Sequence, residues 1–101
     1  MAHLQVSVEV AKDIDRIHDH LAQHQVADAT ERLQQILQAL SVLELNPLIG
    51  RPFADDTDDR RELVIGRRGR GYLALYRYVA ALDTVFILAL RAQAEAGYTE
   101  R

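Results

Sequence analysis

The chain has 101 residues, with twelve basic and fifteen acidic side chains and a formal net charge of −3. This length predicts one domain, residues 1–101, with one modest hydrophobic core. The absence of cysteine excludes disulfides and thiolate metal sites. No apolar run approaches the ~18 residues of a membrane span, and the opening MAHLQVSVEV lacks the features of a secretion signal. We therefore expect a soluble cytoplasmic protein without a membrane partner.

The N-terminal part has a pattern typical of one short strand followed by a helix. Apolar and polar side chains alternate from Leu4 to Val8, which predicts a half-buried strand. The spacing then lengthens, so that one face of an amphipathic helix carries Val10, Ile14, Ile17 and Leu21. Ser7 has the hydroxyl group of a helix N-cap.

A second helix is predicted to begin at about Ala27. Its buried stripe comprises Ala29, Leu33, Ile36, Leu40 and Leu43, with Leu37 beside it. Asn46-Pro47 ends this helix, because the residue before a proline avoids the helical conformation. The short link between the helices predicts an antiparallel helical hairpin.

The C-terminal half predicts a loop and three strands. Residues 46–61 contain both prolines and four aspartates, a composition typical of a loop. Strands are expected at Glu62–Ile65, Tyr72–Val79 and Thr84–Arg91. The turn RRGRG joins the first two strands, and Ala80–Asp83 joins the last two. Gly66, Gly69 and Gly71 are available for the positive φ angles that such a turn uses.

These elements predict an α+β fold with the order β-α-α-β-β-β, in which the helical hairpin packs on one face of a small antiparallel sheet. In the strand Tyr72–Val79 the tyrosines at positions 72, 76 and 78 share one face. The other face carries Leu73, Leu75, Arg77 and Val79. Alternation alone leaves open which of these faces packs on the helices.

Arginines are concentrated in the strand-forming region. Residues 60–77 carry six arginines and one acid, Glu62, whereas residues 1–50 carry three basic and seven acidic side chains. The planar guanidinium group suits phosphates and carboxylates, so this cluster predicts a surface for an anionic partner. The alternative is a solvated turn. The candidate binding residues are Arg60, Arg61, Arg67, Arg68, Arg70 and Arg77.

Other polar clusters do not predict a metal or cofactor site. His20 and His24 are four residues apart on the first helix, but no acid or cysteine at motif spacing completes a ligand set. The aspartates of the loop lack the glycine and terminal glutamate of a calcium loop. RRGRG lacks the helix that follows a phosphate-binding glycine motif. We expect the protein to function with no cofactor and no metal.

Four strings in chain order resemble the RelE/ParE toxins of bacterial type II toxin–antitoxin, or plasmid stabilisation, modules. These strings are LELNPLIGRPF, RELVIG, GYLALYRY and TVFILALRAQAEAGY, and the resemblance extends from about Val6 to Tyr98. It implies a small toxin that a cognate antitoxin keeps inactive by wrapping around it. It also implies that operator DNA is contacted only through the antitoxin.

The resemblance implies two alternative targets. ParE-like members poison DNA gyrase, and RelE-like members cut mRNA on the ribosome without a metal. For a ribonuclease, the matching residues would be Arg77, Arg91 and Tyr98. Other positions depart from the ribonuclease pattern, because cations or histidine are replaced by Val64, Gly66, Leu73 and Ala92. Gyrase inhibition is therefore the leading hypothesis, followed by mRNA cleavage and by a non-toxic module that retains only antitoxin affinity.

Overall fold

The computed structural model describes residues 1–23, 29–54, 58–67, 69, 71–95 and 97–98. Of the residues named above, His24, Ala27, Arg68 and Arg70 lie outside this part, as do Asp55 and Asp56 of the aspartate loop. None of the helices in the described part is long and apolar enough to cross a membrane.

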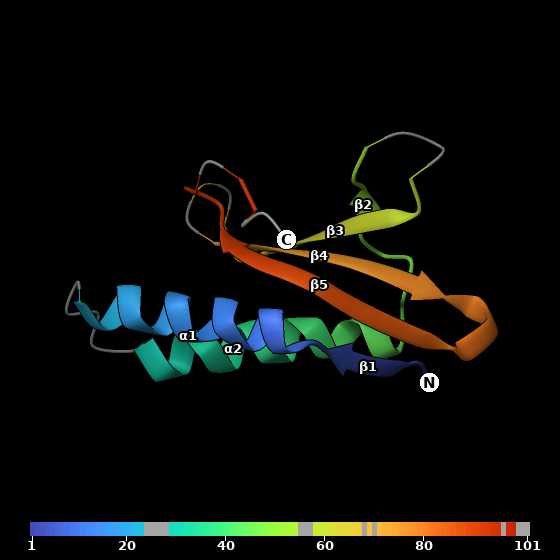
Figure 1. Ribbon diagram of the computed structural model, residues 1–101, viewed down its shortest axis with the longest axis horizontal. Helices are drawn as coiled ribbons and strands as arrows, with labels where there is room; N and C mark the ends of the chain where they lie inside the picture. Colours follow the sequence, from blue (N-terminus) through green and yellow to red (C-terminus); the bar gives the residue numbers. More distant parts are fainter. Residues whose placement is uncertain (24–28, 55–57, 68, 70, 96, 99–101) are drawn as a thin grey trace.

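Two helices lie along one side of a sheet (Figure 1). In chain order the elements are β1 (His3–Val6), α1 (Val8–Gln23), α2 (Ala29–Ser41), the 3-10 turn η1 (Val42–Glu44), β2 (Arg51–Pro52), β3 (Arg60–Ile65), β4 (Tyr72–Val79), the 3-10 turn η2 (Ala80–Leu82) and β5 (Thr84–Ala92). The α+β fold with a helical hairpin on a sheet is therefore confirmed.

The sheet differs from the expected small antiparallel one. It has five strands in the order β1-β5-β4-β3-β2, and β1 runs parallel to β5 while the other pairs are antiparallel. The sheet is mixed because the N-terminal strand pairs with the last strand of the chain. Strand β2 lies inside the segment expected to be a loop, with Arg51 opposite Glu62 and Pro52 opposite Arg61.

Helix α1 follows its N-cap as expected, whereas α2 ends at Ser41 and continues as the 3-10 turn η1, so it stops short of the Asn46-Pro47 end that the sequence predicted. The amide of Val10 donates a hydrogen bond to Ser7 Oγ at 3.3 Å, which confirms the N-cap. Val8 lies in the first turn of α1 and is 69% exposed, so the strand predicted to include it ends earlier, at Val6. After α2, Leu43 is fully buried from the 3-10 turn η1, whereas Leu37 is exposed on the helix surface.

The tyrosine face of β4 packs on the helices, which answers the question that alternation left open. Tyr76 is fully buried and belongs to the same core cluster as Ile36 and Leu40 of the helical layer, while Tyr72 and Tyr78 pack at its margin. The amide of Gly50 donates to Tyr76 Oη at 2.8 Å. Burial raises the pKa of Tyr76, so its hydroxyl is neutral in this apolar setting.

The opposite face of the sheet carries the alternate residues of β3, β4 and β5. The pairing places Glu62, Leu75 and Ala89 in one row, and Arg60, Arg77 and Phe86 in the next. The register shifts between Leu75 and Tyr76, because Leu75 lies opposite Ala89 and Tyr76 lies opposite Ile87. Strand β5 therefore has one additional residue, Leu88, between these two pairs. Such a bulge increases the local twist of a sheet. We refer to this face, which the helices do not cover, as the open face.

The glycines of the first hairpin serve two purposes. Gly66 and Gly69 have φ angles of 82° and 81°, as expected for left-handed turn positions. Gly71 is available for a positive φ angle but does not adopt one. A Cβ atom at Gly71 would lie 1.9 Å from the carbonyl oxygen of Ile65, so close backbone contact selects glycine there.

The second half of β5 pairs with β4 on one edge, and on its other edge, beyond the end of β1, it is bonded by side chains of α1. Strand β1 pairs with β5 only from Thr84 to Ile87. Farther along, the amide of Leu90 donates to buried Asp13 at 3.0 Å, and Arg16 donates to the carbonyl oxygen of Leu90 at 3.1 Å. Two helix side chains thus satisfy backbone groups that an additional strand would otherwise bind.

Candidate functional site

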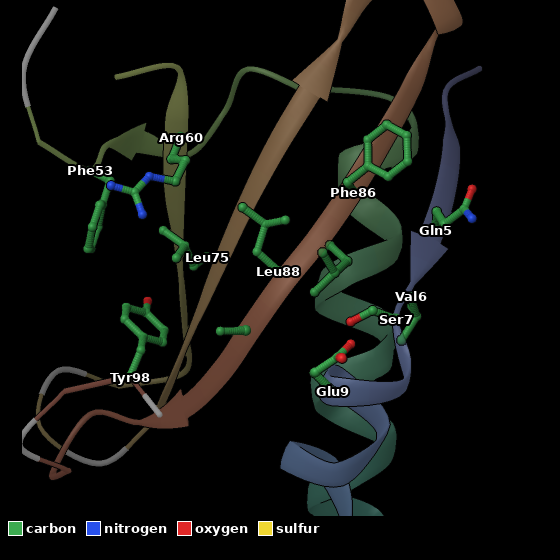
Figure 2. Close-up of a pocket in the computed structure, with 12 residues that line it drawn as sticks. Gln5, Val6, Ser7, Glu9, Phe53, Arg60, Leu75, Phe86, Leu88 and Tyr98 are labelled. Atoms are coloured by element: carbon green, nitrogen blue, oxygen red, sulfur yellow. The ribbon is translucent and has the colours of Figure 1, made fainter. Parts of the chain in front are cut away.

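A groove of about 720 Å³ crosses the open face of the sheet. Figure 2 shows Phe53, Arg60 and Tyr98 at one end, Leu75 and Leu88 along the floor, and Phe86 with Gln5 toward the other end. The junction of β1 and α1 completes the far wall with Val6, Ser7 and Glu9. The groove is lined mostly by apolar side chains and has an arginine at one end and a glutamate at the other, which suits an extended peptide better than a small polar ligand.

Glu62 is a buried carboxylate near the Phe53–Tyr98 end of the groove. Its residue is 6% exposed. Tyr98 Oη donates to Glu62 Oε2 at 2.6 Å, and Arg51 donates to Glu62 Oε1 through Nε at 3.0 Å and Nη2 at 2.5 Å. Burial opposes ionisation, but the hydrogen bonds from Tyr98 and Arg51 outweigh it and hold the pKa of Glu62 below its ordinary value. Glu62 is thus an ionised and hydrogen-bonded group at neutral pH.

Tyr98 is held against the open face by three side-chain contacts. Besides its bond to Glu62, its ring lies 5.0 Å from the Arg91 guanidinium carbon and meets the Phe53 ring edge-to-face, with centroids 5.9 Å apart. Burial, and then the bond to Glu62, raise the pKa of Tyr98, so its hydroxyl is a neutral donor. We call the residues around this ring, Phe53, Glu62 and Arg91, the Tyr98 pocket.

The energy that holds Tyr98 is modest. A hydrogen bond to a charged group contributes about 1.5–3 kcal/mol, and cation–π and edge-to-face contacts add roughly 0.5–1 and 0.5–1.5 kcal/mol. Ordering each backbone residue of the returning tail costs about 1–2 kcal/mol. These opposing quantities are of similar size, so Tyr98 is closed over Glu62 by a small net free energy.

Two of the arginines predicted to bind a partner, Arg60 and Arg77, form ion pairs within the molecule at one end of the open face. Arg60 and Arg77 lie directly opposite each other on β3 and β4, an arrangement that like charges disfavour. Asp58 accepts from Arg60 Nε at 2.9 Å, and Asp59 accepts from Arg77 Nε at 2.7 Å. The hydrogen bonds from Arg60 lower the pKa of Asp58 to about 2. Both cations are therefore compensated by neighbouring aspartates.

The other predicted arginines occupy different settings. Arg61 points to the other side of β3 and donates to the carbonyl oxygens of Gly50 at 2.8 Å and Leu48 at 3.2 Å. Arg67 is exposed in the β3–β4 turn. Arg60 also lies over the Phe53 ring, with its guanidinium carbon 4.9 Å from the centroid. The assignment of this cluster to a partner stays a prediction.

The three residues predicted for a ribonuclease are only partly brought together. Arg91 and Tyr98 are in contact. Arg77 pairs with Phe86, whereas Arg91 pairs with Leu73, four residues away along β4. Four residues of a strand span ~13 Å. Arg91 donates through Nη1 to the carbonyl oxygen of Glu95 at 2.7 Å, and its buried Nε has no hydrogen-bond partner among the residues that the structure describes.

Sequence reasoning missed Glu62, Arg51 and Phe53 as site residues. Glu62 did carry a signal, because it is the one acid among six arginines between residues 60 and 77. Alternation along β3 also places it on the same face as Arg60. Arg51 and Phe53 had no comparable signal, since both fall in the segment that composition identified as a loop.

Comparison with solved structures identifies the fold of toxins from toxin–antitoxin complexes. The chromosomal ParDE system of P. aeruginosa matches with a TM-score of 0.69 and 22% identity, over 91% of this chain and 96% of that chain. The intact E. coli RelBE complex gives 0.62 and 17%, over 94% and 99%. RelBE2 of Mycobacterium tuberculosis gives 0.57 and 21%, over 90% and 96%. At these identities the likeness is one of fold.

The family follows from the sequence itself. The model of the ParE toxin of the type II toxin–antitoxin system parDE matches residues 4–97. The chain belongs to this ParE toxin family, within the broader RelE/ParE group, as its resemblance implied. No curated protein sequence matches the chain.

Proposed function

We propose that this protein, as one toxin domain over residues 1–101, inhibits DNA gyrase and is neutralised by a cognate antitoxin. The match of residues 4–97 to the ParE toxin family carries the proposal. Inhibition by binding requires a complementary surface rather than a set of convergent catalytic groups. The groove of the open face is such a surface, and the ~13 Å separation along β4 of the Arg77 and Arg91 positions disfavours a shared catalytic centre.

The antitoxin is the proposed occupant of the groove. An extended segment crossing the open face would bury Leu75, Leu88 and Phe86, and would meet Arg60 at one end and Glu9 at the other. Carboxylates of such a segment could replace Asp58 and Asp59 as partners of Arg60 and Arg77. The same exchange is available to an anionic surface of the target, so neutralisation and toxicity would compete for these arginines.

Purified protein tests the proposed target directly. Added to gyrase, ATP and relaxed plasmid, it is expected to reduce supercoiling and to accumulate cleaved DNA. The variant Arg60→Glu/Arg77→Glu is expected to lose this effect, whereas Lys12→Glu, on the exposed surface of α1, should retain it. Normal supercoiling at a large excess of folded wild-type protein would contradict the proposal.

The β3–β4 turn is the second part of the proposed binding surface. The variant Arg67→Glu/Arg68→Glu/Arg70→Glu reverses three charges of the predicted cluster. We expect it to weaken gyrase inhibition, antitoxin binding or both, with the circular dichroism spectrum unchanged. A folded variant with unchanged inhibition and antitoxin affinity would remove this turn from the site.

A second candidate function is mRNA cleavage on the ribosome, which one observation favours. Tyr98, Glu62 and Arg91 bring a phenol, a carboxylate and a guanidinium into contact, and these groups can transfer protons and stabilise charge at a phosphodiester. Expression in cells separates the candidates. Cleaved messages and translation arrest indicate the ribonuclease, whereas filamentation with DNA-damage signalling indicates gyrase inhibition. Normal growth without antitoxin would indicate a non-toxic binding module.

A further inference from the structure

The segment that follows β5 is fastened before it reaches Tyr98. The amide of Gln93 donates to the Gly71 carbonyl oxygen at 2.9 Å, and Gln93 Oε1 accepts from the Gly69 amide at 2.5 Å. Glu95 closes a turn onto Ala92 with an amide hydrogen bond of 3.1 Å and forms an ion pair with Arg16. The chain is thus anchored at Glu95, three residues ahead of Tyr98.

Tyr98 itself is attached in a different way. The three contacts described for it are made by its side chain, to Glu62, Arg91 and Phe53. Gly97, immediately before it, is exposed, and a Cβ atom built there would meet no atom within 4 Å. The side-chain contacts of Tyr98 are thus separate from the bonds that anchor Gln93 and Glu95, so displacement of the ring does not require those bonds to break.

The Tyr98 pocket has the properties of a binding site for the ring that fills it. Phe53 supplies an aromatic edge, Arg91 a cation beneath the ring, and Glu62 an ionised acceptor for the hydroxyl. Arg51 holds Glu62 in place from β2. In Figure 2 the Tyr98 ring faces Phe53 at the end of the groove, so the pocket and the groove are continuous.

We propose that the Tyr98 pocket is a binding site for a phenolic side chain, which Tyr98 occupies within its own chain and which a tyrosine of a partner peptide in the groove takes over. The identity of that partner as the antitoxin rests on the proposed function. The chemistry of the pocket does not, because it is defined by the contacts of the tyrosine already bound. A partner of this kind must displace Tyr98, because the two tyrosines compete for the same pocket.

The variant Tyr98→Ala in the full chain tests this proposal, with p-cresol, the side-chain analogue of tyrosine, as the probe. Binding is measured by NMR shifts of the Gly97 and Val64 amides and of the Arg91 guanidinium. We expect p-cresol to bind the variant at least roughly tenfold more tightly than wild type. Toluene, which lacks the hydroxyl, should bind the variant roughly tenfold more weakly than p-cresol, as loss of a charge-assisted hydrogen bond requires.

A matched control uses a second tyrosine that donates to an acid. Tyr78 Oη donates to Asp83 at 2.8 Å outside the groove, and Tyr78→Ala should gain no affinity for p-cresol. Equal affinity in wild type and Tyr98→Ala, equal affinity for toluene, or equal gain in Tyr78→Ala would overturn the proposal. If Tyr98→Ala does not fold, Tyr98→Phe replaces it. The phenylalanine cannot donate to Glu62, so p-cresol should displace its ring more easily than it displaces Tyr98 in wild type.

This experiment is independent of the target. A folded Tyr98→Ala variant that does not bind p-cresol removes the pocket, whatever the protein does to gyrase. Conversely, normal supercoiling in the presence of wild-type protein removes the proposed function and leaves the p-cresol result standing. The two failures are therefore distinguishable.

Discussion

Two tyrosines on opposite faces of the sheet show how differently this fold uses the same side chain. Tyr76 is fully buried beneath the helices and accepts from a backbone amide. Tyr98 lies on the open face, near the end of the chain, and donates to a carboxylate. The first is fixed by the packed core on every side, whereas the second is held by three side-chain contacts. The helical face thus provides most of the stability, whereas the open face carries contacts that a partner can replace.

The largest expected difference between the faces is in stability. Tyr76→Ala leaves a cavity in the core and is expected to lower the free energy of unfolding by about 3–5 kcal/mol. Urea denaturation followed by circular dichroism measures this loss. A loss below about 1 kcal/mol would mean that the helical face is not the stabilising side of the molecule.

Removing the charge of Glu62 is expected to have an intermediate effect. Glu62→Gln replaces an acceptor of bonds from Arg51 and Tyr98 by an amide that cannot accept all of them, at a cost of about 1–3 kcal/mol at pH 7. Urea midpoints and slopes of the two proteins at pH 7 measure the difference.

The difference in stability between wild type and Glu62→Gln should depend on pH. The pKa of Glu62 is lower in the folded protein than in the unfolded chain, so its stabilisation is complete above the unfolded value and is lost as pH falls through the folded value. Wild type should therefore lose its advantage over Glu62→Gln on acidification below about pH 4.3. A stability difference that stays constant from pH 7 to pH 3 would contradict this linkage.

Tyr98→Phe sharpens the comparison at a smaller scale. The ring and its contacts with Arg91 and Phe53 remain, and only the bond to Glu62 is lost. We expect a loss of about 1 kcal/mol, since Glu62 keeps its bonds to Arg51. Hydrogen exchange at the Phe53 amide, which donates to the Arg60 carbonyl oxygen beside the Tyr98 ring, should accelerate, while exchange at the Tyr76 amide should change only by the global loss of stability. Equal acceleration at both amides would show that the two faces open together.

The smallest effect concerns a single titration. The hydrogen bonds from Arg60 lower the pKa of Asp58 to about 2, and NMR of the carboxyl carbon should show this value directly. In Arg60→Gln the pKa is expected to rise toward the ordinary value of about 3.9. An unchanged value would mean that Arg60 does not neutralise Asp58, and that the arginines of the open face are available without exchange of partners.

Much of the layered fold could be predicted because its signals are local. The bounds of β4 were predicted to the residue, and the Ser7 cap follows from a hydroxyl placed just before an amphipathic stripe. Strand β2 could not be predicted in this way, because two residues are too few to show alternation. The parallel pairing of β1 with β5 joins the two ends of the chain, and no local pattern encodes it.

The Tyr98 pocket escaped sequence reasoning for a related reason. Glu62 and Tyr98 are 36 residues apart and belong to a strand and a returning tail. Each alone resembles an ordinary surface residue, and only the folded chain brings them into contact. The arginines of residues 60–77 were identified, but their pairing with Asp58 and Asp59 depends on how the loop meets β3 and β4.

The bonds from Asp13 and Arg16 to Leu90 have a mechanical consequence. They fasten the middle of α1 to the last part of β5, so a shift of the helix would leave an amide and a carbonyl group without partners. Arg16 also binds Glu95, at the base of the tail that carries Tyr98. One side chain therefore joins α1 to both the end of β5 and the base of the tail, and loss of Arg16 would release both attachments at once.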